Sequence, residues 1–111
     1  MIRTEKRDKV DIISFTTDRL NALGTDELMD GVKALLQTGS TRLIINLNGV
    51  QYIDSSGFGC LLSIMKTARN HYCSMKLASP EAPVMEVLRT LNLHTILDIH
   101  DDLDECVRSL N

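Results

Sequence analysis

Tryptophan is absent from this 111-residue sequence, and phenylalanine and tyrosine occur only twice each. A folded core must therefore be built mostly from Leu, Ile, Val and Met. Basic residues are not in excess either, because 12 Lys and Arg stand against 15 Asp and Glu, for a net charge of −3. Neutralising phosphates requires clustered Lys and Arg, so nucleic acid is not expected as a partner.

Long apolar runs are also missing. No run is longer than the three residues of Leu43-Ile44-Ile45, far short of the ~20 residues that a membrane span needs. The first residues are charged from Arg3 onward and contain no apolar segment of the kind found in signal peptides. We therefore expect no membrane span and a cytoplasmic location.

Cysteine is scarce and shows no pairing pattern. Cys60, Cys73 and Cys106 are odd in number and widely spaced, with no Cys-x-x-Cys pair and no Cys/His cluster. Neither a disulfide framework nor a zinc site fits this spacing. The acidic run 98–105 lacks the glycine and the ligand spacing of a calcium loop. We expect buried, reduced thiols, no metal and no cofactor.

The composition is that of a globular protein, with 43% hydrophobic and 24% charged residues. The length predicts one domain over residues 1–111. Apolar and β-branched residues predict strands over 10–15, 42–47, 74–78 and 95–99, with a weaker strand before the first.

Helices are expected between these strands. The apolar spacing and the capping residues place them from a cap at Thr25 to Gly39, from Asp54 or Ser55 to about residue 70, after Pro83, and from Asp102 onward. Strands that alternate with helices in this way are typical of the α/β class.

The sharpest local feature is the tetrapeptide Asp54-Ser55-Ser56-Gly57, which precedes the most clearly amphipathic helix. Asp54 or Ser55 can cap that helix, which places Ser56 in its first turn, near backbone N–H groups that have no partner. Two interpretations are open. Either these residues are helix caps and nothing more, or the exposed hydroxyl of Ser56 carries a phosphate that the helix dipole favours.

Segment 43–59 resembles the signature of STAS domains, in particular that of the bacterial anti-sigma factor antagonists. The shared pattern is an apolar strand, the turn Asn48-Gly49-Val50, an aromatic or apolar residue, and then Asp54-Ser55-Ser56-Gly57 followed by Phe58 and Gly59. The predicted elements follow the order of this family along nearly the whole chain. The resemblance implies a STAS fold: a small mixed central sheet with about four to five helices.

Anti-sigma factor antagonists bind an anti-sigma factor that is also a serine kinase, and the binding releases a sigma factor. The resemblance implies that Ser56 is phosphorylated, that phosphorylation abolishes binding, and that a phosphatase restores it. We expect the partner-binding residues to be Asn21, Asp54, Ser55, Ser56, Gly57, Gly59 and Ser63.

One position departs from the family pattern. Many antagonists carry Gly-x-Leu-Asp at the end of the early strand, whereas this chain has Asp18-Arg19-Leu20-Asn21, with Asn21 in place of the acid. A second use of the fold therefore stays open: a constitutive STAS subunit of a lipid-transport ABC complex or of a stress-signalling assembly. In that case the surface over 54–60 would bind a different protein.

Enzyme classes fit the motif poorly. A nucleophile elbow around Ser55 would need glycine at position 53, where the chain has Ile53, and the spacing of the three histidines nominates none as a base. A phospho-receiver needs an acidic pair and a late lysine that are missing, and Gly57-Phe58-Gly59 alone is a weak nucleotide signal. The chain is expected to be a binding protein and not an enzyme.

Overall fold

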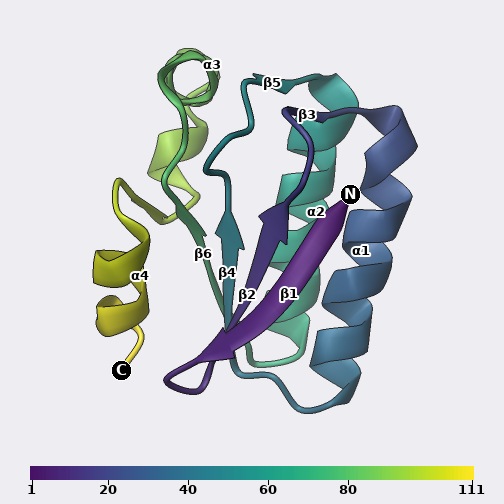
Figure 1. Ribbon diagram of the computed structural model, residues 1–111, viewed down its shortest axis with the longest axis vertical. Helices are drawn as coiled ribbons and strands as arrows, with labels where there is room; N and C mark the ends of the chain where they lie inside the picture. The colour runs from purple at the N-terminus through teal and green to yellow at the C-terminus, as the bar shows by residue number, and fades with distance from the viewer.

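The computed structural model describes residues 1–111 and contains a five-stranded mixed sheet (Figure 1). The strands lie in the order β1-β2-β4-β6-β7; β1 is antiparallel to β2, and all other neighbours are parallel. Their bounds are Ile2–Arg7 for β1, Val10–Phe15 for β2, Arg42–Asn46 for β4, Ser74–Ala78 for β6 and Ile99–His100 for β7. The α/β class and the mixed central sheet are thus confirmed.

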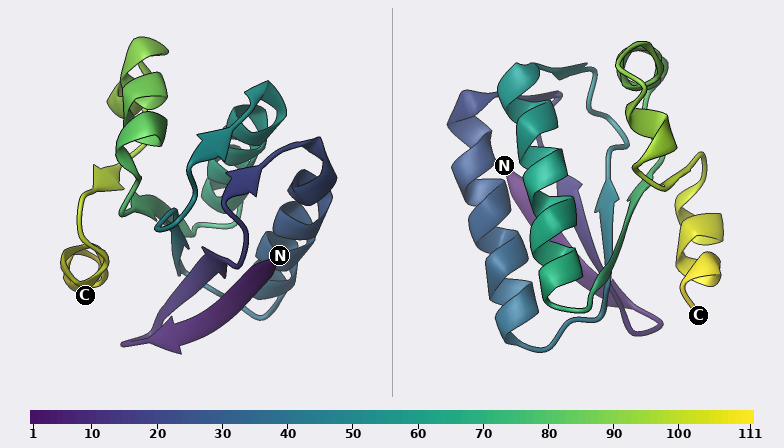
Figure 2. Two further views of the ribbon diagram at one scale, coloured as in Figure 1. Left: turned by 45° about the horizontal axis from the view of Figure 1, so that its top comes forward. Right: turned by 180° about the vertical axis from the view of Figure 1, so that it is seen from behind.

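Helices cover both faces of this sheet. α1 and α2 lie side by side on one face, α4 lies on the other, and α3 sits beyond one end of the strands (Figures 1 and 2). None of them has the length and hydrophobicity that crossing a membrane requires. The bounds are Ala22–Gln37 for α1, Ser55–Asn70 for α2, Ala82–Thr90 for α3 and Leu103–Ser109 for α4.

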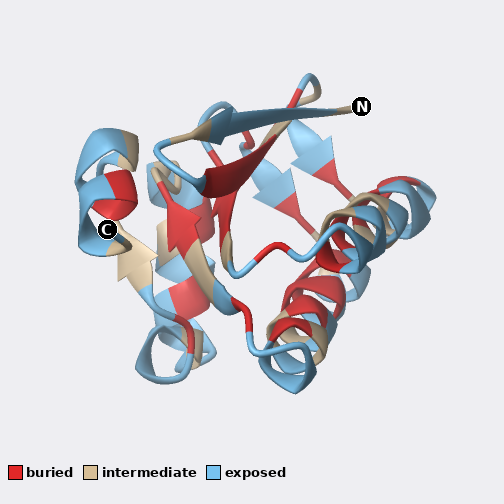
Figure 3. Cartoon of the chain, turned by 90° about the horizontal axis from the view of Figure 1, so that it is seen from below, coloured by how far each residue is buried: buried red, intermediate tan, exposed pale blue.

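The alternation of side chains along the central strands explains their apolar composition. Ile13 and Ile45 belong to the large core beneath α1 and α2, whereas Ile12 and Ile44 belong to a smaller core beneath α4. All four are fully buried, and the inner strands are buried while the edge strand β1 is exposed (Figure 3). A strand covered on both faces buries side chains in both directions, so most of its residues are apolar.

The first helix starts earlier than the sequence pattern predicts. The expected cap at Thr25 is wrong, because α1 begins at Ala22 and Asn21 is its cap. The Asn21 Oδ1 accepts the Leu23 N–H at 3.1 Å, and the Thr25 hydroxyl donates to the Ala22 carbonyl at 3.2 Å from inside the helix. Asparagine caps helices at least as well as threonine does, which explains why the helix can begin at the earlier position.

The predicted strand over 95–99 is also largely wrong. Residues Leu93–Thr95 form a short 3-10 helix, η1, and only Ile99 and His100 pair with β6. Asn92 has a left-handed backbone (φ +58°), and its carbonyl accepts the Thr95 hydroxyl at 2.6 Å. These local bonds turn the chain where we expected it to extend, and the strand begins only afterwards.

A two-stranded parallel ribbon lies apart from the main sheet. It is formed by β3 (Arg19–Leu20) and β5 (Tyr52–Ile53), which precede α1 and α2 respectively. The ribbon appears beside the starts of both helices in Figure 1. It therefore fixes where the first turns of α1 and α2 lie relative to one another.

Candidate functional site

The ribbon brings the starts of two helices together. Leu20 stands opposite Ile53 in the parallel register, and the Asp54 N–H donates to the Leu20 carbonyl at 3.2 Å, which continues the pairing by one residue. Asn21 and Asp54 follow directly on the two strands. Each is the cap of a helix, so the site is built on two neighbouring helix N-termini.

Asp54 closes the first turn of α2. Its Oδ1 accepts the Gly57 N–H at 2.9 Å, and its carbonyl accepts the Phe58 N–H at 3.0 Å. The amides of Ser55 and Ser56 have no carbonyl four residues earlier within the helix to bond. They therefore remain available to an acceptor on a partner or to an anion on the Ser56 side chain.

A stripe of small residues runs along the exposed side of α2 from this turn. Ser56, Gly59 and Ser63 are spaced by three and four residues, which places them on one face of the helix, and all three are exposed. A Cβ added at Gly59 would meet no atom within 4 Å. Ser55 is exposed beside the stripe, so the structure brings these four predicted residues to one surface.

Gly57 has a different position from the one we expected for a contact residue. It is buried, and a Cβ there would lie 2.5 Å from Ile53 Cγ2 and 2.7 Å from the Leu20 carbonyl oxygen. The absence of a side chain lets α2 lie directly against the ribbon. Gly57 therefore supports the site from behind and does not line its surface.

Asn21 is half-buried and follows β3 as Asp54 follows β5. Its side-chain oxygen is engaged by the Leu23 amide, so the residue serves as a helix cap. Asparagine and aspartate are about equally good caps. Asparagine in place of the acid therefore leaves the stability of the helix start unchanged, and it removes one negative charge from the site.

Two side chains that border the site were missed in the sequence. The Arg19 guanidinium lies over the Tyr52 ring, 5.9 Å from its centroid, and Tyr52 is 53% exposed. Both point outward because their strand neighbours Leu20 and Ile53 point inward. The short alternation of polar and apolar residues at these two places is the signal that could have identified them.

Cys60 lies behind the stripe and does not offer a nucleophile. It is buried, and its Sγ is 3.7 Å from the Thr25 carbonyl oxygen of α1. Burial, and secondarily the negative charge of Asp26, raise the pKa of its thiol. The thiol therefore stays protonated near neutral pH and packs α2 against α1. Cys73 and Cys106 are likewise buried and free, as predicted.

Histidines with polar partners lie away from the site. His71 ends α2 at the helix terminus opposite Ser56, and His100 contacts Asp98 and Glu105 near α4. No group of three or more metal-ligating side chains gathers anywhere in residues 1–111. The site offers exposed hydroxyls, free amides and one cap carboxylate, a set suited to binding a protein surface.

The STAS domain family model matches residues 1–106 of the chain. A Thermotoga maritima protein assigned by name to the anti-sigma factor antagonists is 29% identical over 75 residues, which are 68% of this chain. The matched stretch is 66% of that relative, slightly under two thirds of its length.

Two solved structures share the fold. An anti-sigma factor antagonist (STAS) domain protein from Planctomyces limnophilus has a TM-score of 0.86 at 22% identity, over 97% of this chain and 96% of the other. The phosphorylated form of the Bacillus cell fate determinant SpoIIAA has a TM-score of 0.76 at 17% identity, over 100% of both chains. At these identities the likeness establishes the fold of the whole chain.

Proposed function

Because the chain belongs to the STAS domain family, we propose that it is an anti-sigma factor antagonist. It binds an anti-sigma factor that is also a serine kinase, and this binding frees a sigma factor for transcription. The chain itself works in the cytoplasm as a binding protein and catalyses no reaction. Phosphorylation at Ser56 ends the complex, and a phosphatase resets the chain.

The exposed stripe on α2 is the observation that carries this proposal. Ser56, Gly59 and Ser63 present little side-chain volume, so a partner can approach the helix backbone closely. The helix is held rigidly at this end by the Asp54 cap and by the packing of Gly57 on the ribbon. A rigid surface loses little conformational entropy on binding.

Electrostatics supports a phosphate switch at Ser56. A phosphate carries about −1.5 to −2 charges, and in the free chain it would lie beside the unpaired amides of Ser55 and Ser56 at the positive end of the α2 dipole. The free chain therefore tolerates the modification without unfolding.

In the complex the same phosphate would lose its water. It would lie in a closed interface near the Asp54 carboxylate, where like charges repel and the lost hydration is not replaced. A penalty of about 3 kcal/mol would weaken binding by roughly two orders of magnitude.

The surface is tested with Gly59→Arg. A large cation in the middle of the stripe should abolish binding to the proposed partner, an anti-sigma factor kinase purified from the same organism, as measured by calorimetry. The matched control is Asn70→Arg, an exposed position at the far end of the same helix, which should bind normally. Normal binding by Gly59→Arg, with folding intact, would place the interface elsewhere.

The switch is tested by incubating the protein with that kinase and ATP and mapping the phosphate by mass spectrometry. We expect phosphate on Ser56 and loss of binding in both the phosphorylated protein and Ser56→Asp. Asn21 favours one alternative, because the acid of the family pattern is missing next to the serine. If Ser56→Asp binds as tightly as wild type, the chain is instead a constitutive subunit of a lipid-transport ABC complex or a stress-signalling assembly.

A further inference from the structure

An open groove lies at the opposite end of α2 from the stripe. It has a volume of about 440 Å³ and lies between the last turns of α2, the start of β6 and the segment 96–98. Its walls are polar and apolar in nearly equal parts; the apolar side chains that matter most are Met65, Tyr72, Met75, Ile96 and Leu97. Ser56 and Asn70 are separated by about 21 Å along the helix axis, so the groove is a separate site.

The floor of the groove is an unpaired strand edge. The backbone groups of Ser74 and Ala78 bond toward β4, as the bonds from Ser74 N–H to the Thr41 carbonyl and from Leu47 N–H to the Ala78 carbonyl show. The backbone N–H and C=O groups of Met75 and Leu77 point away from β4, toward the side where β7 lies. On that side the Leu77 N–H donates to the Asp98 carbonyl. Because β7 pairs only with Leu77 and Ala78, the N–H and C=O groups of Met75 have no partner strand.

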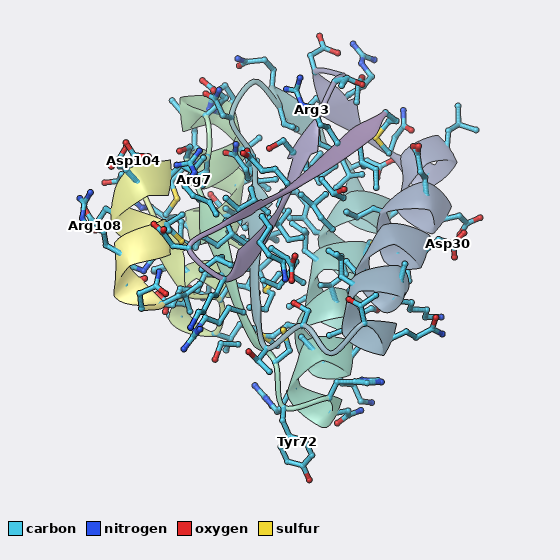
Figure 4. The ribbon with its side chains drawn as sticks, turned by 60° about the horizontal axis from the view of Figure 1, so that its bottom comes forward. Arg3, Arg7, Asp30, Tyr72, Asp104 and Arg108 are labelled. Atoms are coloured by element: carbon cyan, nitrogen blue, oxygen red, sulfur yellow. The ribbon has the colours of Figure 1, made fainter.

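Two exposed apolar side chains flank this edge. Tyr72 is 92% exposed and projects from the end of the molecule (Figure 4), and Ile96 is 55% exposed. Tyr72 also has a left-handed backbone with φ +55°, a conformation that bulky residues rarely adopt. A large aromatic side chain therefore stands at a helix end where glycine is favoured.

The charge on the rim selects the partner. Lys76 is held by Asp98 at 3.1 Å and by the Ser109 hydroxyl at 2.9 Å. Arg69 is exposed and forms no ion pair with any acid of the chain. A carboxylate entering the groove would therefore find one free guanidinium, which can bind it through two hydrogen bonds.

We propose that this groove binds a short extended peptide segment of another protein, with alternating apolar and acidic side chains. The peptide pairs its backbone with Met75 N–H and C=O, as in strand addition to a sheet edge. Its apolar side chains pack on Tyr72 and Ile96, and an acidic side chain binds Arg69. The flexible thioethers of Met65 and Met75 adapt the walls to the incoming side chains.

The test begins by selecting short random peptides on phage against the whole chain, with the Ile96→Asp protein as counter-selection. The enriched peptides should alternate apolar and acidic residues. A synthetic peptide of the enriched sequence is then titrated into isotope-labelled protein. On saturation the Met75 amide signal should move and its hydrogen exchange should slow by about tenfold.

Matched variants test each part of the proposal. Arg69→Glu should weaken the peptide about tenfold, whereas Arg89→Glu, an exposed cation on α3, should bind as wild type does. Gly59→Arg should also bind the peptide normally, which separates this site from the proposed function.

Three results would overturn the proposal. The first is no enrichment over the counter-selection. The second is a peptide that binds Arg69→Glu at full affinity and leaves the Met75 amide unchanged. The third is a dimer of the free chain, seen in sedimentation and abolished by Ile96→Asp, which would assign the groove to a second copy.

Discussion

Asn21 and Asp54 occupy equivalent positions at the ends of two parallel strands, and each caps the helix that begins after it. Asn21 Oδ1 accepts the Leu23 N–H, and Asp54 Oδ1 accepts the Gly57 N–H. The two caps differ in charge, since one is an amide and the other a carboxylate. They differ also in the N–H group they accept, which lies two residues after Asn21 and three residues after Asp54. The serine turn therefore lies next to one cap acid, where the family pattern has a second acid in the place of Asn21.

Exchanging this amide for an acid separates folding from switching. Asn21→Asp keeps a good cap and should change the free energy of unfolding by only a few tenths of a kcal/mol, whereas Asn21→Ala should cost about 1 kcal/mol. If the family's acid assists the kinase, Asn21→Asp should speed the phosphorylation of Ser56. Unfolding in urea and radiolabel incorporation measure the two effects, and slower labelling of Asn21→Asp would contradict this role.

Replacing each of two α2 glycines with alanine should change the stability of the protein in opposite directions. Gly57→Ala forces a Cβ to within 2.7 Å of the Leu20 carbonyl oxygen, a backbone atom that cannot move without shifting the ribbon. We expect it to lose about 1–3 kcal/mol of stability. Gly59→Ala meets open space and should gain up to about 1 kcal/mol from helix propensity. Equal midpoints in urea unfolding would contradict the close approach at Gly57.

The central strand should be sensitive to loss of volume. Ile45 is fully buried on β4, between β2 and β6, beneath α1 and α2. Ile45→Ala leaves a cavity that its neighbours cannot fill, and should cost about 2–5 kcal/mol. Chemical denaturation measures this loss. A cost under about 1 kcal/mol would show that the core around β4 collapses without strain.

Cys106 should make the fold sensitive to alkali. Its side chain is fully buried beneath the sheet, and this burial raises its pKa from 9.0 to about 11, opposed by Lys76 and reinforced by Asp98 and Glu105. The unfolded thiol loses its proton at lower pH than the folded one, so stability is fully present below pH 9.0 and falls as the pH rises toward about 11. The loss should reach about 3 kcal/mol, since each unit of pKa difference corresponds to about 1.36 kcal/mol.

The comparison with Cys106→Ala isolates this contribution, because every other ionisable group is present in both proteins. The wild type should lose more stability than the variant over the same pH range in urea unfolding. If the free energy of unfolding falls equally with pH in both proteins, the fold does not raise the pKa of the Cys106 thiol.

The succession of strands and helices along the chain could be predicted because it follows from local patterns. The run around Ile44 and Ile45 is apolar on both faces and predicts a central strand, and the periodic spacing after Ser56 predicts α2. Both predictions are confirmed. The motif also placed Ser56 in a first helical turn, since aspartate and serine before an apolar repeat are typical caps.

The remaining features depend on contacts that the sequence does not display. Asn21 rather than Thr25 caps α1 because the ribbon pairs Leu20 with Ile53, and a pairing of two short strands leaves no period to detect. The segment at Thr95 is β-branched but turns, because Asn92 adopts a left-handed backbone. The groove exists for the same reason: a shorter β7 leaves the edge of β6 at Met75 open.

Tyr72 should be a position where stability and binding conflict. The residue follows the last turn of α2, where its N–H bonds to the Arg69 carbonyl at 3.1 Å and the Cys73 N–H bonds to the Ala68 carbonyl at 2.9 Å. This helix ending usually has glycine at the left-handed position. Tyr72→Gly relieves the strain at φ +55° and removes an exposed side chain that packs on little, so the variant should gain about 0.5–1 kcal/mol. The same change removes the aromatic wall of the groove, so the peptide selected on the wild type should bind it at least about fivefold more weakly.

Tyr72→Asn, which also tolerates the left-handed backbone, is the control and should show a smaller gain with the same loss of binding. Thermal unfolding and calorimetry measure the two effects, and full peptide affinity in a stabilised Tyr72→Gly protein would show that the tyrosine has no part in the groove.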